Sequence, residues 1–256
     1  MIPIDLTGKV AVVTGATGEL GRVITRTLAQ AGASVAIVYH SNRKRALALQ
    51  AEIARAHSEG KTTIVQADVT DQRSIFALRD AVKTALGPAD ILVNNAVIQY
   101  QWTSVLDQAA ADYESQFRSC VLHNVFMAKA FVPDMIAKRW GRVIALNTEC
   151  TMQACPNQSA YISGKAGMDR VLRVLAKEVG PHQITVNQVA PGWMISDKYR
   201  GTPEEHPPEY EANVPLRRRG YDQDIANAVT FLASDLAAFI TGAYLPVCGG
   251  NVMPAI

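Results

Sequence analysis

Cysteine is scarce in this 256-residue chain, and the four cysteines show neither metal-finger nor C-x-x-C spacing. We therefore expect reduced thiols, as in a cytoplasmic protein, and no metal site. The formal net charge of +2 gives no reason to expect a nucleic-acid or membrane partner. No charged start precedes a long apolar stretch, and no uncharged apolar run reaches about 18 residues. Neither a signal peptide nor a transmembrane helix is expected.

Short apolar runs that alternate with helical patterns dominate the chain, in which 48% of residues are hydrophobic and 19% charged. The expected strands are Val10–Val13, Val35–Val38, Thr63–Gln66, Ile91–Val93, Arg142–Leu146, Thr185–Val189 and Tyr244–Val247. The expected helices lie near 20–31, 42–58, 71–86, 104–118, 121–139, 159–179 and 222–233. This alternation predicts an α/β fold: a single Rossmann-type domain over residues 1–256, with a doubly wound parallel sheet of about seven strands and helices on both faces.

Residues 194–220 interrupt this alternation with a polar, proline-rich stretch after the sixth expected strand. In open α/β sheets, ligands bind at the carboxyl ends of the strands. We therefore predict that this segment is a substrate lid. It contains the basic run Arg217–Arg219, which we expect to be a solvated loop, with contact to substrate or cofactor as the alternative.

A glycine-rich turn follows the first expected strand and precedes a helix. The combination of strand, glycine turn and helix is typical of a dinucleotide-binding unit, in which the helix N-terminus receives the pyrophosphate. The alternative is an ordinary strand–helix turn. The candidate cofactor contacts in the turn are Gly15, Thr17, Gly18, Glu19, Leu20 and Gly21.

Tyr161 and Lys165 are four residues apart within the expected helix 159–179. Residues at this spacing share one face of a helix. A lysine ammonium beside a phenol favours the phenolate, so we expect the pKa of Tyr161 to fall below its usual value of about 10. Such a tyrosine can exchange a proton with a substrate oxygen. The alternative is a solvated helix face.

Further motifs follow successive strands in a fixed order. They are Asp68-Val69, Asn94-Asn95-Ala96, Pro191-Gly192-Trp193-Met194-Ile195-Ser196, and Thr241-Gly242 to Gly249-Gly250. Together with the glycine turn and the Tyr161/Lys165 pair, this order resembles the compact, roughly 250-residue branch of the short-chain dehydrogenase/reductase family, from Lys9 to Gly250. The resemblance implies an NAD(P)-dependent oxidoreductase that forms dimers or tetramers.

The same resemblance implies four catalytic residues: Asn124, Thr148, Tyr161 and Lys165. Thr148 stands where the family usually has serine and keeps the hydroxyl. The alternative is a structural threonine, with Ser159 or no residue in that role. The implied cofactor contacts beyond the glycine turn are Asp68, Val69, Asn95, Ala96, Tyr161, Lys165, Pro191, Gly192, Met194 and Ser196.

Three further positions depart from the family pattern. Glu19 replaces a glycine, and we expect its side chain to point to solvent; an inward orientation would repel pyrophosphate. Val97 replaces a glycine and is expected to narrow the pocket. Cys248 replaces an aspartate, which we expect to affect local packing rather than chemistry.

The segment after the second strand favours NADP over NAD. NAD enzymes generally place an acidic residue there, but residues 39–45 contain no Asp or Glu and three basic side chains follow Asn42. Arginine and lysine attract a 2′-phosphate. Ser41, Asn42 and Arg43 are the expected contacts, unless they simply begin a solvated helix.

The leading hypothesis is an NADP-dependent enzyme that acts on a carbonyl or secondary alcohol, with Tyr161 as general acid/base. Beta-ketoacyl-carrier-protein reductases and sugar or polyol dehydrogenases both match this pattern. The alternatives are a catalytically silent nucleotide-binding regulatory protein, or a lyase or epimerase on the same fold. The residues expected to line the substrate site are Gln99, Tyr100, Trp102, Glu149, Met152, Gln153 and Trp193.

Overall fold

One seven-stranded sheet organises the computed structural model, which describes residues 4–56 and 60–253. Its order is β3-β2-β1-β4-β5-β6-β9, and every neighbouring pair is parallel. The strands are β1 (Val10–Val13), β2 (Ser34–Tyr39), β3 (Thr62–Gln66), β4 (Ile91–Asn94), β5 (Gly141–Leu146), β6 (Ile184–Pro191) and β9 (Tyr244–Val247). The predicted doubly wound sheet is confirmed.

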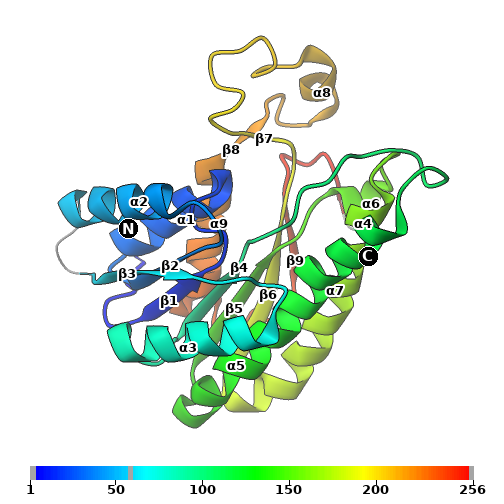
Figure 1. Ribbon diagram of the computed structural model, residues 1–256. Helices are drawn as coiled ribbons and strands as arrows, with labels where there is room; N and C mark the ends of the chain where they lie inside the picture. The colour runs from blue at the N-terminus through cyan, green and yellow to red at the C-terminus, as the bar shows by residue number, and fades with distance from the viewer. Residues whose placement is uncertain (1–3, 57–59, 254–256) are drawn as a thin grey trace.

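Helices cover both faces of this sheet (Figure 1). One layer contains α1 (Glu19–Gln30), α2 (Arg43–Ala56) and α9 (Asp222–Ala233); the other contains α3 (Gln72–Leu86), α5 (His123–Lys138) and α7 (Ser159–Val179). In β1, Ala11 and Val13 pack against the first layer, whereas Val10 and Val12 pack against the second. The strands read as continuous apolar runs because both faces are buried. The last two residues of the expected helix 42–58 lie outside the described residues.

The helix before α5 differs from its prediction. A helix was expected over 104–118, but α4 spans Ala110–Gln116 and continues through a π-helical turn, η1 (Phe117–Leu122), into α5. The continuous stretch Ala110–Lys138 is long and apolar enough to cross a membrane by length and composition alone. Half of its most apolar window is buried inside the protein, however, and the core helix of a soluble protein passes the same test. This is weak evidence for a membrane span.

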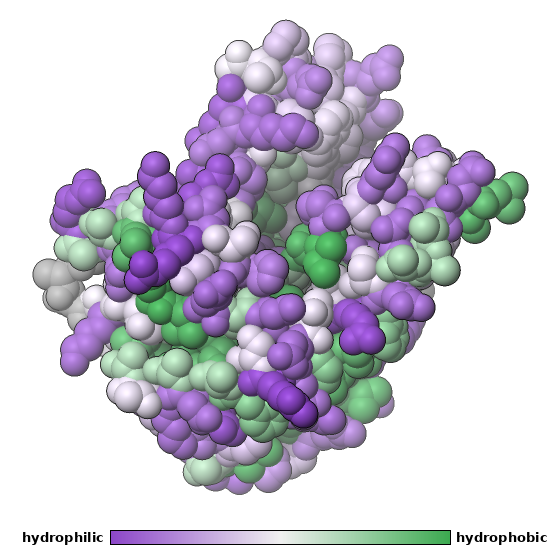
Figure 2. Space-filling model, in the orientation of Figure 1, coloured by the Kyte–Doolittle hydropathy of each residue, from purple (hydrophilic) through white to green (hydrophobic). Residues whose placement is uncertain are grey.

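The 194–220 segment projects above the carboxyl edge of the sheet (Figure 1). It contains β7 (Met194–Ile195) and α8 (Pro208–Asn213), and β7 pairs with β8 (Gly220–Tyr221) in a separate two-stranded sheet. Figure 2 shows a recess between this projection and the rest of the molecule. The expectation of a solvated Arg217–Arg219 run is wrong for Arg219, which is fully buried.

Candidate active site

The glycine turn between β1 and α1 is shaped by close backbone contacts. Gly15 has a φ of 61°, in the left-handed region that favours glycine. A Cβ on Gly21 would lie 2.1 Å from the carbonyl oxygen of Gly15, so a side chain there would displace the turn. Gly18 caps α1 without any side-chain hydrogen bond. The first-turn amides are therefore open to an anion, which fits the pyrophosphate of a dinucleotide.

A cleft of about 580 Å³ extends from this turn along the carboxyl edge of the sheet. Its lining includes most of the predicted cofactor contacts: Gly15, Thr17, Gly18, Glu19, Leu20, Ser41, Asn42, Asn95, Ala96, Tyr161, Lys165, Pro191, Gly192 and Met194. A smaller cavity of about 200 Å³ shares Gly15 and Ala96 with it and is lined by the predicted Asp68 and Val69. Val97 lines both spaces. The residues present thus fit a dinucleotide.

Asn95 fixes the β4 end of this cleft. Its side-chain amide donates to the carbonyl oxygens of Thr14 and Gly15 at 3.0 and 3.1 Å. Its backbone N–H donates to Thr14 Oγ1 at 3.0 Å. These bonds tie the ends of β1 and β4 together, so Asn95 shapes the glycine turn as well as lining the cleft.

Three predicted cofactor contacts line neither the cleft nor the smaller cavity. Gly21 packs behind the turn, and Ser196 lies beyond β7. Arg43 begins α2 but is also absent from the lining. Arg45, two residues after Arg43, instead lines an adjoining pocket of about 270 Å³ together with Arg22. The sequence did not single out Arg22 or Arg45 because their position depends on how α1 and α2 pack side by side.

The Glu19 side chain was expected to point to solvent, but the structure places it in a contact at the cleft. It lines the cleft, and its Oε2 accepts a hydrogen bond of 2.9 Å from the backbone N–H of Asp197. Arg22, one turn along α1, forms an ion pair of 2.6 Å with the Asp197 carboxylate. The start of α1 therefore holds the first residues of the 194–220 segment. Glu19 is committed to this contact rather than left free.

Thr148, Tyr161 and Lys165 meet in the cleft, because hydrogen bonds join Lys165 of α7 to Leu146 and Asn147 at the end of β5. Lys165 is 4% exposed, and its Nζ donates to the carbonyl oxygen of Leu146 at 2.5 Å. It lies 5.8 Å from the centre of the Tyr161 ring. Burial lowers the pKa of Lys165.

The expected fall in the pKa of Tyr161 is wrong. Burial raises the pKa of this phenol well above its ordinary value, and hydrogen bonding with the Thr148 side chain opposes that rise only in part. Lys165 lies on the predicted face, but its ammonium is bound to Leu146 rather than to the phenol oxygen. Tyr161 is therefore a neutral acid at neutral pH.

Asn124 lies beneath the site and lines neither the cleft nor the second pocket described below. Its carboxamide is 2.7 Å from two partners: it accepts from Asn94 Nδ2 and donates to the carbonyl oxygen of Cys120. The Cys120 carbonyl belongs to the π-helical turn, so Asn124 braces that turn. Its neighbour His123 is buried, and desolvation lowers the pKa of His123 to about 4.

A second pocket of about 600 Å³ adjoins the cleft. Both spaces share Gln99, Thr148, Tyr161 and Gly192. Of the predicted substrate residues, all but Met152 line it: Gln99, Tyr100, Trp102, Glu149, Gln153 and Trp193. The prediction missed Ile98, Cys150, Cys155, Gln158, Tyr199 and Tyr210. The two tyrosines lie in the 194–220 segment, so its prediction as a lid could have identified them as pocket residues. No pattern in the sequence marked the two cysteines as pocket residues.

Aromatic side chains and one carboxylate characterise this pocket. Trp102 stacks on Tyr161 with ring centres 6.1 Å apart, and Trp193 meets the Tyr210 ring edge-on at 5.3 Å. Glu149 is 4% exposed and accepts from the Tyr210 hydroxyl at 3.2 Å and from Asn251 Nδ2 at 3.1 Å. Burial raises the pKa of the Glu149 carboxyl. Within residues 4–56 and 60–253, no cluster of three metal-ligating side chains occurs.

Comparison with known proteins agrees with this geometry. A family model described as enoyl-(acyl carrier protein) reductase matches residues 15–251. The chain is 38% identical to the 3-oxoacyl-(acyl-carrier-protein) reductase FabG of Haemophilus influenzae, across 95% of this chain and 98% of that protein. It is 36% identical to the enzyme of the same name from Escherichia coli, across 96% and 98%.

A crystal structure described as a short-chain alcohol dehydrogenase from Sinorhizobium meliloti superposes with a TM-score of 0.88 at 30% identity, covering 98% of each chain. The relatives are named as enzymes, so the hypothesis of a silent regulatory protein is not supported. The family model and the relatives match nearly the whole chain. The parallel sheet and the Tyr161/Lys165 pair point to the same family. The chain belongs to the short-chain dehydrogenase/reductase family and is an oxidoreductase.

Proposed function

We propose that this protein transfers a hydride between NADP(H) and a carbonyl or secondary alcohol substrate, with the substrate held in the aromatic pocket. One observation carries the proposal: Thr148 and Tyr161 line both the dinucleotide cleft and the aromatic pocket. A carbonyl that touches both hydroxyls therefore lies where the two spaces meet. When bound, the nicotinamide supplies the hydride chemistry.

Each catalytic side chain has a distinct role in this proposal. Tyr161 donates its phenolic proton to the carbonyl oxygen, since burial keeps this phenol neutral before the reaction. Thr148 donates a hydrogen bond to the same oxygen and holds it beside Tyr161. The buried ammonium of Lys165 stabilises the phenolate that remains. Asn124 is a positioning residue that braces the π-helical turn behind them.

The preference for NADP is supported by the surroundings of the 2′ position. His40, Ser41 and Asn42 line the cleft after β2, and none of them is acidic. Arg45 lies in the adjoining pocket. We expect Arg43→Ala to weaken NADPH binding more than NADH binding by about tenfold, the size of one charge-assisted hydrogen bond. Arg45→Ala, measured in parallel by nucleotide titration, decides which arginine contributes more. Equal losses for both nucleotides in both variants would refute the preference.

The lid role of residues 194–220 is supported by three contacts. Tyr199 and Tyr210 line the aromatic pocket, and Met194 lines the cleft. A segment that borders both spaces can exclude water from the reacting groups.

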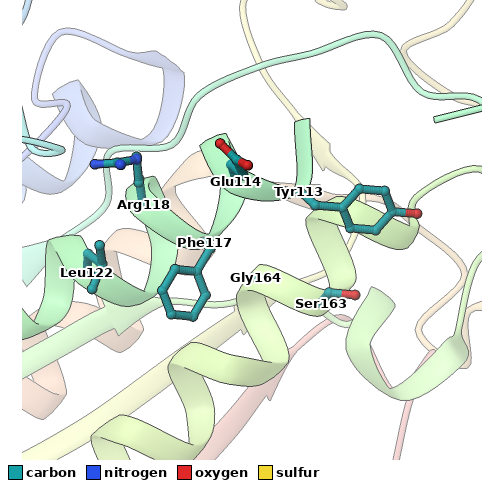
Figure 3. A pocket seen from close by; sticks show the side chains of 7 residues that line it. All are labelled: Tyr113, Glu114, Phe117, Arg118, Leu122, Ser163 and Gly164. Carbon is teal, nitrogen blue, oxygen red and sulfur yellow. The ribbon is translucent and has the colours of Figure 1, made fainter. Parts of the chain in front are cut away.

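We also propose that the protein is a cytoplasmic homo-oligomer, a dimer or tetramer. All four cysteines are free, which suits a reducing compartment. Figure 3 shows a groove between α4, η1 and α7, where the exposed ring of Phe117 lies beside Leu122 and Gly164. An apolar ring in such a groove suits contact with a second copy of the chain. Sedimentation of the purified protein tests this assignment.

The decisive experiment is a panel of carbonyl substrates followed by oxidation of NADPH or NADH. The panel includes an acetoacetyl thioester, because the relatives are named 3-oxoacyl reductases, and hydroxylated ketones, because the pocket contains a buried carboxylate. We expect turnover of at least one carbonyl and a preference for NADPH. If no carbonyl is reduced but nucleotide binds, a lyase or epimerase on this fold becomes the better hypothesis.

A further inference from the structure

Two cysteines flank α6 (Cys150–Gln153) at the aromatic pocket. Cys150 is the first residue of this one-turn helix, and Cys155 follows two residues after its end. Both side chains are partly exposed, both line the pocket, and neither forms a disulfide. The proposed reduction chemistry uses neither thiol.

The backbone turns back on itself between these two cysteines. Ala154 adopts the left-handed conformation with φ 51° and ψ 50°, and its N–H donates to the carbonyl oxygen of Cys150 at 3.0 Å. This turn ends α6 and brings the chain back towards its first residue. In a helix end of this kind, the residue after the left-handed position frequently contacts the residue whose carbonyl accepts this bond, and these residues are Cys155 and Cys150. The Cys155 thiol now donates to Gln153 Oε1 at 3.3 Å, a contact that side-chain rotation releases. Two cysteines brought together by such a turn can be bridged after that rotation and a small backbone adjustment.

We propose that Cys150 and Cys155 form a dithiol modification site whose reaction partner is a small-molecule disulfide such as oxidised glutathione. The product is an intramolecular disulfide in the wall of the aromatic pocket. We expect the disulfide to stop carbonyl turnover while the dinucleotide cleft still binds its nucleotide. This expected effect on turnover rests on the function proposed above.

The chemistry proceeds by two thiol–disulfide exchanges. The Cys155 thiol loses its proton to solvent and attacks one glutathione sulfur, which forms a mixed disulfide and releases the first glutathione thiolate. Cys150 then loses its proton and attacks Cys155 Sγ, which closes the protein disulfide and releases the second thiolate. The two cysteines lose two electrons, and one oxidised glutathione is reduced to two thiols.

The order of attack follows from the environment of Cys150. Burial raises the pKa of the Cys150 thiol to about 11, so its nucleophilic thiolate is scarce at neutral pH. We therefore assign the first, bimolecular step to Cys155. The second step is intramolecular, and the short turn between two cysteines on the same pocket wall gives it a high effective concentration that offsets the low thiolate fraction.

The expected effect on turnover follows from a contact to Thr148. The backbone N–H of Cys150 donates to Thr148 Oγ1 at 3.3 Å, so a bridge that shifts α6 disturbs the hydroxyl that holds the carbonyl. The cleft lining includes neither Cys150 nor Cys155. Nucleotide binding should therefore survive closure of the bridge.

The experiment treats the full-length protein with oxidised glutathione and follows intact mass, peptide linkage, NADPH fluorescence titration and carbonyl turnover. We expect loss of two thiol hydrogens without a retained glutathionyl group, and a linkage between Cys150 and Cys155. The NADPH dissociation constant should stay within about twofold while turnover falls by at least about tenfold. Dithiothreitol should restore turnover.

Matched variants separate the steps. Cys150→Ser should stop at a stable glutathionyl adduct on Cys155, and Cys155→Ser should form no bridge. Cys248→Ser is the control, because Cys248 is absent from the aromatic pocket lining and the variant should still close the bridge. A stable wild-type adduct, a different linkage, full turnover after closure, or loss of NADPH binding together with turnover would each overturn the proposal. If the reduced protein turns over no carbonyl, the proposed function fails, whereas the linkage map still decides whether the dithiol exists.

Discussion

Thr148 and Tyr161 are the residues on which the proposed chemistry depends. Thr148 follows the end of β5, and Tyr161 lies in the first turn of α7. Both side chains line the place where the dinucleotide cleft adjoins the aromatic pocket. Burial keeps the Tyr161 phenol protonated, and Trp102 stacks on its ring. In the proposed chemistry, Tyr161 is the proton donor to a bound carbonyl and Thr148 holds that carbonyl, so the two side chains should have separable effects.

Tyr161→Phe removes the proton donor and keeps the ring. General acid catalysis typically contributes about 10²–10⁴-fold, so we expect kcat to fall within that range. NADPH should still bind, since the cleft has many other lining residues. Steady-state kinetics and a nucleotide titration check both parts. A variant that keeps wild-type kcat on its best substrate would show that Tyr161 is not the acid.

Thr148→Val and Thr148→Ser distinguish a catalytic hydroxyl from a structural threonine. Valine nearly keeps the shape but loses the donor, and loss of one such donor costs about 10²–10³ in kcat. Serine keeps the donor, so activity should be retained or raised. The free energy of unfolding of the serine variant, measured by urea titration, should change little. Wild-type kcat in the valine variant would assign Thr148 a structural role, and Ser159 would be the next hydroxyl to test.

The π-helical turn η1 is the element that shapes the floor of the site. It inserts between α4 and α5 and is braced by Asn124 through the Cys120 carbonyl. His123 follows the turn, with its Nδ1 3.2 Å from the Ser119 carbonyl oxygen and its Nε2 buried without a hydrogen-bond partner among the described residues. π-Helical turns frequently mark functional sites. The burial of His123 makes this element sensitive to acid.

His123→Gln should flatten the acid dependence of stability. Burial lowers the pKa of His123 to about 4, below its ordinary 6.5, so the unfolded chain binds this proton more tightly than the folded protein does. The stability that neutral His123 confers is complete above pH 6.5 and is lost as the pH falls towards about 4. The shift corresponds to at most about 3 kcal/mol. Urea titrations near pH 6.5 and near pH 4 should show that the free energy of unfolding falls more between these values in wild type than in the variant. An equal fall in both proteins would contradict the prediction.

At the scale of the whole molecule, the 194–220 segment is joined to the body from several directions. Glu19 and Arg22 hold Asp197, and Tyr210 bonds to Glu149. Arg219 is fully buried within the segment. Its guanidinium donates to the carbonyl oxygens of Trp193, Met194 and Glu204, and lies 4.3 Å from the Trp193 ring centre. Arg219 thus fixes the shape of the segment over both ligand spaces.

Arg219→Lys should loosen this segment. Lysine keeps the charge but cannot reproduce the planar fork that reaches several carbonyls, so buried acceptors lose partners. We expect KM for the carbonyl substrate to rise about tenfold, and faster proteolysis within 196–218. Arg218→Lys is the matched control, because the Arg218 side chain is exposed and paired with Asp224. Equal proteolysis rates in the two variants would contradict the assigned role.

The sequence by itself determined the sheet, the glycine turn and the position of Tyr161 and Lys165 on one face of α7. These depend on local patterns: continuous apolar runs for strands buried on both faces, the glycines between the first strand and helix, and the spacing of Tyr161 and Lys165. The order of the strands was not predicted: the shared handedness of crossovers in a parallel sheet restricts the possible orders, and the structure shows which one is adopted.

Only the tertiary structure decided the charge states and the contacts across the site. Burial, not the neighbouring lysine, sets the pKa of Tyr161, and burial depends on what packs over the ring. Glu19 was expected in solvent but is held by Asp197, 178 residues away in the chain. Arg219 is buried because the 194–220 segment folds around its guanidinium. Desolvation and long-range contacts are properties of the packed chain, so no local pattern in the sequence encodes them.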